Sequence, residues 1–233
     1  MRQVPHYLLI GNGRVARHFQ HYFFLLNIPF LSWHRGEELS QLQMHLKSAT
    51  HILLLISDKA IDAFIEQYLK NRAAFKIHFS GSLNSHYAYG LHPLMSFNQD
   101  LYELEDYQHI PFVIDQDAPE FAKLLPGLPN QHARLDKVLK AKYHASCVLA
   151  NNFSCLLWQK FMRTLQEFNL SPDFAKTFLR QSTKNLLENP ATALTGPLVR
   201  NDFNTINANL NALEGDPFKE VYRSFVEAYQ REK

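Results

Sequence analysis

Short apolar segments alternate with amphipathic segments over the first half of the chain. The runs 5–10, 28–33, 51–56 and 75–79 are apolar on both faces, while 14–26, 37–48 and 60–71 repeat apolar residues at helical spacing. Further strands are predicted near 88–92 and at 110–114. Two-sided apolar strands that alternate with helices are typical of a parallel sheet covered by helices on both faces. The pattern therefore predicts an α/β fold.

The second half has a different pattern. Strands are no longer predicted after residues 126–130, and residues 136–168 fit one helix that would be roughly 50 Å long. The middle of this helix is apolar on nearly every side, so it should be buried. A domain of about 100 residues cannot easily enclose such a helix. We therefore predict two domains, 1–130 and an all-helical 131–233, and a homodimer formed through the C-terminal helices.

Composition and charge exclude several classes of protein. The chain has 24 Lys+Arg and 22 Asp+Glu, a net charge of +2, which argues against a strongly basic surface for nucleic acid. No apolar run is long enough to span a bilayer. Cys147 and Cys155 lie in one predicted helix, too far apart to form a disulfide, and the histidines lack metal-ligand spacing. We expect a cytoplasmic protein that binds no nucleic acid, membrane or metal.

A glycine turn joins the first predicted strand to the first predicted helix. It has the pattern G-x-G-x-x-A, formed by Gly11, Asn12, Gly13, Arg14, Val15 and Ala16. In this context the first glycine allows the tight turn and the second lets a pyrophosphate approach the backbone. The alanine keeps helix and strand close, and the helix N-terminus attracts the phosphate charge. The turn predicts dinucleotide binding; alternatively, it only packs the strand on the helix.

The ends of the second and third strands indicate which dinucleotide is bound. His34 and Arg35 stand where an NAD site would place an acidic residue, and the next acid is Glu37. A guanidinium suits a 2′-phosphate, so NADP is the predicted cofactor unless Arg35 is only a solvated charge. Ser57 and Asp58 end the third strand beside the predicted crevice, where Asp58 either contacts the cofactor or caps the next helix.

Several segments recur in this order in one uncharacterised family: 11–16, 78–83, 89–94, 143–152 and 194–202. The chain resembles that family, which has a Rossmann domain and a C-terminal helical domain of unknown function, of the 6-phosphogluconate dehydrogenase type. The family in turn resembles the pyrroline-5-carboxylate reductases and the deazaflavin-dependent NADP reductases. The resemblance implies NADP binding and a helical dimerisation domain, but no substrate. Asn201 departs from the family pattern, where a glycine is expected.

Ser80 and His92 are candidate catalytic residues because each follows or ends a predicted strand at the crevice. Gly81 leaves room for a ligand, and Pro93 keeps His92 extended. The Gly-x-His-Pro segment also resembles the prephenate dehydrogenases, which implies that His92 is an acid or base and that Ser80 binds the substrate. The alternative is a structural histidine that holds the loop.

The helical domain contributes further candidates. His144 and Asn152 are predicted to be catalytic, and Asn151 and Arg200 to bind substrate. His144, Cys147 and Asn151 would share one face of an α-helix, although the Lys-x-x-x-Asn pair of related hydroxyacid dehydrogenases is missing. These polar groups could instead tie neighbouring helices together, and Arg200 could pair with Asp202.

The features together predict an NADP-dependent oxidoreductase. It would transfer hydride to or from a small carbonyl, imine or alcohol, with the protein supplying orientation and a proton. The alternative is a non-catalytic protein that binds NADP for regulation or interaction.

Overall fold

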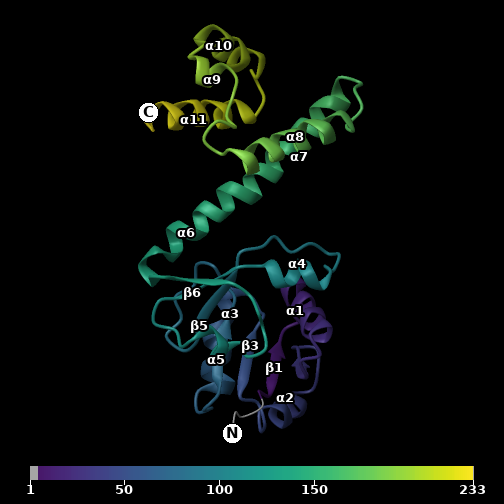
Figure 1. Ribbon diagram of the computed structural model, residues 1–233, viewed down its shortest axis with the longest axis vertical. Helices are drawn as coiled ribbons and strands as arrows, with labels where there is room; N and C mark the ends of the chain where they lie inside the picture. Colours follow the sequence, from purple (N-terminus) through teal and green to yellow (C-terminus); the bar gives the residue numbers. More distant parts are fainter. Residues whose placement is uncertain (1–4, 233) are drawn as a thin grey trace. The chain divides into compact units, whose positions relative to one another are not determined.

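The computed structural model describes residues 5–232, and the chain divides between Ser154 and Cys155 into two compact units (Figure 1). The first unit is a sheet covered by helices, and the second is entirely helical. None of the helices formed by residues 5–232 is long and apolar enough to cross a membrane.

A seven-stranded sheet with the order β2-β1-β3-β4-β5-β6-β7 forms the centre of the first unit. All neighbouring strands are parallel except β5 and β6. This is the predicted Rossmann-like α/β fold, with one antiparallel pair added. The strands are β1 (Tyr7–Ile10), β2 (Phe30–Trp33), β3 (His51–Leu54), β4 (Phe75–His78), β5 (Tyr89–Pro93), β6 (Phe112–Asp115) and β7 (His132–Leu135).

Helices bury both faces of the sheet, which explains why the central strands have no polar side. Phe19 and Phe23 of α1 pack on one face, together with α4 and α5, while α2 and α3 pack on the other. The helices are α1 (Arg14–Leu25), α2 (Leu39–His45), α3 (Asp58–Phe64), α4 (Leu104–His109) and α5 (Phe121–Leu124). A π-helical turn, Ile65–Leu69, continues α3 without a break.

The strands continue beyond the point where the sequence predicted that they end. β7 pairs in parallel with β6, from Phe112 beside His132 to Asp115 beside Leu135. The prediction of no strand after residue 130 is therefore wrong. β7 lacks the apolar pattern because it is the edge strand, with its first residues exposed. The first unit accordingly extends past residue 130, to Ser154.

Helical elements follow one another without a gap from Lys137 to Glu167, as the pattern predicted. They are a 3-10 turn (Lys137–Leu139), α6 (Lys140–Cys147), a π-helical turn (Val148–Phe153) and α7 (Ser154–Glu167). Both cysteines are free. The apolar middle is not buried within one chain, since Leu149 and Phe153 are 57% and 46% exposed. Its predicted burial against a second subunit stays a prediction.

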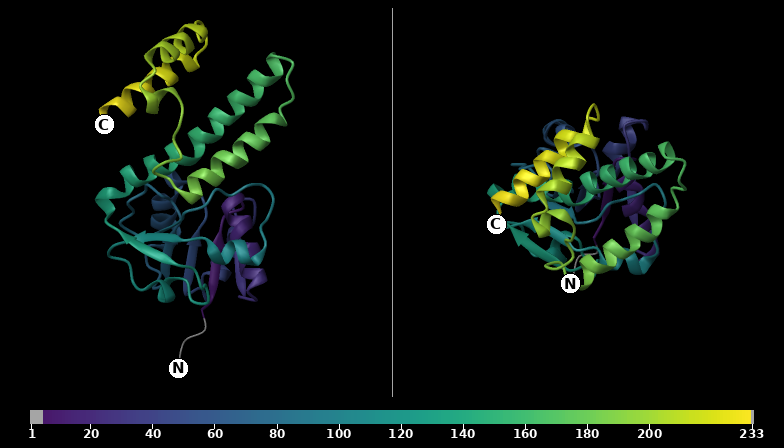
Figure 2. Two further views of the ribbon diagram at one scale, coloured as in Figure 1. Left: turned by 45° about the horizontal axis from the view of Figure 1, so that its top comes forward. Right: turned by 90° about the horizontal axis from the view of Figure 1, so that it is seen from above.

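The second unit contains α7 and α8, which form an antiparallel hairpin (Figure 2). The rings of Trp158 and Phe161 in α7 contact Phe178 in α8. Lys160 pairs with Asp216 at 2.5 Å before the last helix. The remaining helices are α8 (Phe174–Glu188), α9 (Pro197–Arg200), α10 (Phe203–Ala212) and α11 (Phe218–Arg231).

Candidate functional site

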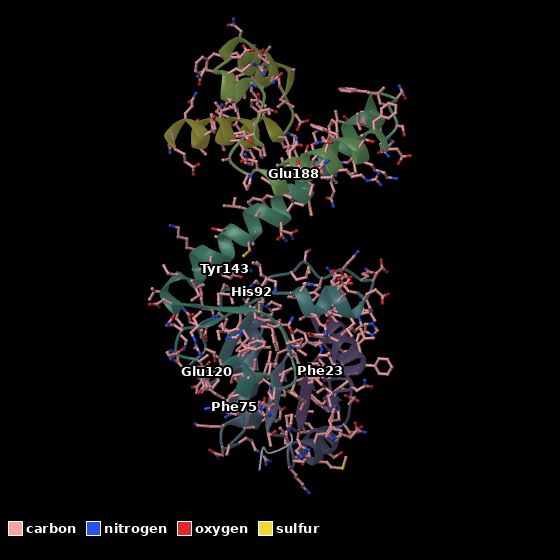
Figure 3. The ribbon with its side chains drawn as sticks, viewed as in Figure 1. Phe23, Phe75, His92, Glu120, Tyr143 and Glu188 are labelled. Atoms are coloured by element: carbon pink, nitrogen blue, oxygen red, sulfur yellow. The ribbon has the colours of Figure 1, made fainter. Side chains whose placement is uncertain are left out.

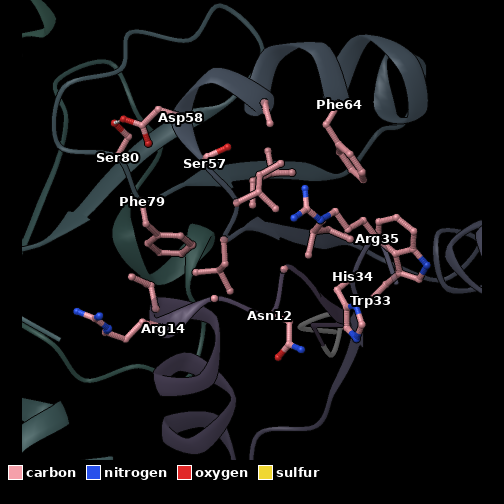
Figure 4. A pocket seen from close by; sticks show the side chains of 18 of the residues that line it. Asn12, Arg14, Trp33, His34, Arg35, Ser57, Asp58, Phe64, Phe79 and Ser80 are labelled. Carbon is pink, nitrogen blue, oxygen red and sulfur yellow. Dashed lines mark hydrogen bonds between the residues drawn. The ribbon is translucent and has the colours of Figure 1, made fainter. Parts of the chain in front are cut away.

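A cleft of about 940 Å³ opens at the carboxyl ends of the first four strands (Figure 4). The strand order reverses at β1, because β2 lies on one side of it and β3 on the other. Open α/β sheets bind ligands at such a switch point. The predicted residues that line the cleft are Gly11, Asn12, Gly13, Arg14, Val15, His34, Arg35, Ser57, Asp58 and Ser80.

The two glycines of the turn differ in what surrounds them. Gly11 has φ +132°, and a Cβ there would lie 2.3 Å from the carbonyl oxygen of Leu55, so only glycine fits. Gly13 is the N-cap of α1, where no side chain caps the helix, and a Cβ there would enter open space. The first-turn N–H groups of α1 thus face an open cradle. This arrangement fits a pyrophosphate.

Basic and aromatic side chains form one end of the cleft. Figure 4 shows Arg35 beside Trp33, with the ring of Phe64 above the guanidinium. Arg35 makes none of the ion pairs found among residues 5–232. Glu37 accepts a hydrogen bond from the His34 N–H at 2.7 Å, so the nearest acid is already engaged. This end is suited to an anionic group and a planar base.

Three aromatic or small side chains of one helix form a wall of the same cleft. They are Ala60 and Phe64 of α3 and Tyr68 of the π-helical turn. The rings of Phe64 and Tyr68 lie 4.9 Å apart. The spacing of four residues predicts a shared helix face for these three side chains, but nothing in the sequence predicts that this face lines the cleft.

Asp58 and Ser80 meet at the other end of the cleft (Figure 4). The Ser80 hydroxyl donates to Asp58 Oδ2 at 2.5 Å, and Ser80 Oγ accepts from the N–H of Leu83 at 3.0 Å. Asp58 does not cap α3: the N-cap position belongs to Ser57, and neither side chain makes a capping bond. The carboxylate of Asp58 instead ties α3 to the loop after β4.

Two imidazoles and a phenol gather over Gly81, the residue after Ser80. Nδ1 of His92 lies 2.8 Å from Oη of Tyr143, and both residues are labelled in Figure 3. A Cβ on Gly81 would lie 3.1 Å from Nε2 of His92 and 2.6 Å from Cδ2 of His144. Both histidines therefore pack directly against Gly81, and a side chain at this position would displace them.

The environment of His92 keeps its imidazole neutral. Burial, and then the charges of His144 and Lys140, lower the pKa of His92 to about 4, while the Asp58 carboxylate acts in the opposite direction. Burial, followed by a hydrogen bond with Cys147, raises the pKa of Tyr143. At neutral pH both partners in the His92–Tyr143 hydrogen bond are uncharged.

A buried ion pair fixes the start of the helix that carries Tyr143 and His144. Nζ of Lys140 lies 2.8 Å from Oδ1 of Asp115, and the two side chains are 5% and 1% exposed. Oδ2 of Asp115 also accepts from the N–H of Gly90 at 2.7 Å. The pair therefore joins α6 to β5 and β6, the strands that position His92.

The remaining predicted site residues lie away from the cleft lining. Ala16, in the first turn of α1, is fully buried, as its predicted packing role requires. Asn151 and Asn152 are exposed within the π-helical turn, and Arg200 is exposed in the second unit. One extra residue in a helical turn rotates the rest of the helix by roughly 100°. His144 lies in α6 and Asn151 inside the π-helical turn, so the regular α-helical face expected to hold both is interrupted between them.

Sequence reasoning missed three side chains of this region. The sequence predicts no role for Tyr143 beyond its place in the recurring segment 143–152, and it predicts none for Lys140 or Asp115. No local pattern indicates that Lys140 and Asp115 meet, because β7 and its flanking loops separate them in the chain. Within residues 5–232, no cluster of three or more His, Cys, Asp or Glu side chains could hold a metal ion.

Solved structures with the same fold cover nearly the whole chain. A protein of Bacteroides fragilis, described as a candidate NADP oxidoreductase, matches with TM-score 0.77 and 20% identity over 97% of this chain and 98% of its own. A protein of Thermotoga maritima matches with TM-score 0.71 and 19% identity over 97% of each chain. Plasmodium falciparum pyrroline carboxylate reductase, solved with NADP bound, gives TM-score 0.60 and 14% identity over 100% of this chain and 97% of its own.

These similarities establish the fold. No curated protein matches the sequence. A family model does match, over residues 110–229, which is more than half of the chain and runs from the end of α4 into α11. By that match, the protein belongs to the family of the domain of unknown function DUF2520.

Proposed function

We propose that the protein is an NADP-dependent oxidoreductase. The observation that carries the proposal is the cleft itself: an open cradle at Gly13 at its centre and Arg35 at one end. Backbone N–H groups at the start of α1 would hold the pyrophosphate. Arg35 and His34 would hold the 2′-phosphate, with the base beside Phe64.

The other end of the cleft supports hydride transfer rather than binding alone. NADP supplies a hydride donor or acceptor when bound. Asp58 and Ser80 line the cleft, and His92 and His144 pack against Gly81, the residue after Ser80, so polar groups gather at this end. The substrate is a small carbonyl, imine or alcohol. The names of the Bacteroides and Plasmodium structures, an NADP oxidoreductase and an NADP-bound reductase, agree with this proposal.

The second unit completes the proposal. Asn151 and Arg200 are proposed substrate-binding groups, and His144 and Asn152 are proposed catalytic groups. The helical unit leaves large apolar side chains exposed, among them Phe174, Leu187 and Phe225 at 64%, 79% and 49%. A homodimer through these helices would bury them. With two free cysteines, we place the protein in the cytoplasm.

Calorimetric titration with NADPH and NADH tests the cofactor assignment. We expect the wild-type protein to bind NADPH at least tenfold more tightly than NADH, and Arg35→Ala to remove most of that difference, about 1.4 kcal/mol per factor of ten. Affinity for NADH should change little, because NADH has no 2′-phosphate. Equal losses for both dinucleotides would contradict the role of Arg35, and no binding of either would contradict the proposed function.

A further inference from the structure

The hydroxyl of Ser80 has no hydrogen-bonding capacity left for a ligand. A serine hydroxyl has one proton to donate and two lone pairs that accept. The proton of Ser80 points at Oδ2 of Asp58, at 2.5 Å. The Ser80 oxygen accepts from the N–H of Ser82 at 3.3 Å and from the N–H of Leu83 at 3.0 Å. Ser80 is also buried, so it is a poor candidate for the group that gives a proton to a substrate.

The Asp58 carboxylate, in contrast, keeps one oxygen available. Oδ2 is held by Ser80, whereas Oδ1 makes no hydrogen bond or ion pair among residues 5–232. Asp58 is exposed and lines the cleft. A carboxylate oxygen accepts hydrogen bonds and has none to donate. The ligand group that fits Oδ1 is therefore a hydroxyl or an N–H.

A second serine–aspartate pair on α3 shows what such a contact does for the fold. The Ser85 hydroxyl donates to Oδ1 of Asp62 at 2.6 Å, and Ser85 Oγ accepts from the N–H groups of Tyr87 and Ala88 at 3.0 and 3.1 Å. Both pairs tie α3 to the loop that follows β4. Of the two carboxylates, Asp58 alone lines the cleft. The pairs thus share a structural role, and the position of Asp58 adds a second one.

The order of the groups along NADP indicates which part of it reaches Asp58. The pyrophosphate separates the adenosine half, with its 2′-phosphate, from the nicotinamide half. With the 2′-phosphate at Arg35 and the pyrophosphate at Gly13, the nicotinamide half extends toward the end of the cleft where Asp58 and Ser80 meet (Figure 4). That half carries the ribose hydroxyls and the carboxamide NH2, which are hydrogen-bond donors.

We propose that Oδ1 of Asp58 accepts a hydrogen bond from the nicotinamide half of NADP, and that Ser80 positions this carboxylate. The inference rests on the proposed NADP-dependent function. Ser80 is held in turn by the backbone of its own loop, so the loop after β4 fixes the direction of Oδ1. Ser80 is therefore a positioning residue, which acts on the cofactor through Asp58.

Calorimetric titration of Asp58→Asn tests the contact with an isosteric side chain. Because Ser80 offers a proton and no free lone pair, the asparagine turns its oxygen to Ser80 and its NH2 to the donor of the ligand. We expect the affinity for NADPH to fall about tenfold or more, as for loss of a hydrogen bond to a charged group. Adenosine 2′,5′-bisphosphate, which lacks the nicotinamide half, should bind as tightly as to the wild type.

Asp62→Asn is the matched control, because it makes the same change in the pair that lies outside the cleft. It should alter the affinity for neither ligand. The fragment 2′-phospho-ADP-ribose, which keeps the second ribose but has no nicotinamide, identifies the donor. If Asp58→Asn weakens this fragment as well, the ribose donates; if it weakens NADPH alone, the carboxamide does. Either result supports the contact.

The double variant Asp58→Asn/Ser80→Ala tests whether Ser80 acts through Asp58. Ser80→Ala alone should weaken NADPH binding by about threefold or more, whereas Ser85→Ala, its matched control, should not. Without Ser80, the asparagine is free to turn its oxygen to the ligand. The double variant should therefore bind NADPH no more weakly than Asp58→Asn, and additive losses would overturn the positioning role.

Two further outcomes separate this inference from the proposed function. A wild-type protein that binds NADPH, together with an Asp58→Asn variant that binds it equally well or loses both NADPH and adenosine 2′,5′-bisphosphate, would overturn the inference alone. A wild-type protein that binds no NADPH would overturn the proposed function and this contact with it.

Discussion

Gly11 and Gly13 lie two residues apart, yet a side chain at each would have a different effect. At Gly13 a valine would extend into open space, so the fold should tolerate it and the pyrophosphate should not. We expect Gly13→Val to weaken NADPH binding about 100-fold or more, or about 2.7 kcal/mol, by calorimetry. Its melting temperature should stay within a few degrees of the wild type.

Gly11→Val provides the contrast to that substitution. Its φ of +132° and the 2.3 Å approach to Leu55 leave no room for a Cβ, so this variant should lose stability as well as binding. A Gly13→Val protein that binds NADPH normally would show that the turn only packs α1 on the sheet.

At the scale of single residues, the sequence predicts the backbone conformation of a position better than it predicts which side chains meet. Asn201 stands where the family pattern has glycine, and it adopts a left-handed φ of 54° at the end of α9, a conformation that glycine favours and asparagine tolerates. The Asp58–Ser80 contact was not foreseen, because it joins residues from two loops. Tyr143 was missed because its importance lies in its distance from His92, which no spacing encodes.

The link between α6 and the sheet depends on one buried charge pair. Lys140→Met would leave the buried Asp115 carboxylate with only Lys137, at 4.0 Å, as a cationic partner, so we expect the free energy of unfolding to fall by about 3 kcal/mol. Urea unfolding followed through Trp33 in a Trp158→Phe background would measure this in the first unit. Lys142→Met on the exposed face of α6 should change it by less than about 0.5 kcal/mol.

The double variant Asp115→Asn/Lys140→Met separates charge from packing. Asparagine still accepts from the N–H of Gly90 but leaves no buried charge. The double variant should therefore recover more than half of the free energy of unfolding that Lys140→Met loses. A double variant as unstable as Lys140→Met alone would show that the lysine acts through packing rather than through the ion pair.

Whole elements were predicted well wherever they are buried on a regular pattern. Strands β1 to β6 and helices α1 to α3 fall within a few residues of their predicted ranges, because burial on both faces imposes a clear apolar period. The edge strand β7 was not predicted, because its exposed residues interrupt the apolar pattern. The π-helical turns were not predicted either, because they keep the apolar spacing of a helix and change only the directions in which its side chains point.

For the whole molecule, the sequence predicts a homodimer formed through the C-terminal helices, whereas the structure describes one chain. In the second unit the buried apolar residues are Leu165, Ala175, Ile206 and Val226, few for a unit of its length. The predicted boundary at residue 130 followed the loss of strand pattern, whereas the compact units divide where contacts are fewest. Contacts between distant residues are not visible in a local pattern, so the pattern predicts that there are two units but not the residue at which they divide.

Sedimentation equilibrium tests the homodimer. We expect twice the chain mass of 27.1 kDa for the wild type. Leu187→Glu, at the 79% exposed position on α8, should raise the dimer dissociation constant at least tenfold, or about 1.4 kcal/mol. Gln181→Glu adds the same charge on a polar position of that helix and should have little effect. A wild-type monomer at every concentration would contradict the assembly.

The π-helical turn at Ile65–Leu69 also bears on how relatives of this protein should be compared. In an unbroken α-helix, the eight residues from Ala60 to Tyr68 overshoot two turns by roughly 80°, and the wider turn takes up that excess. Such a turn is how a helix accommodates one inserted residue. Relatives without the insertion would need a one-residue gap inside this helix when aligned, and an ungapped alignment would equate Tyr68 with a side chain that faces elsewhere.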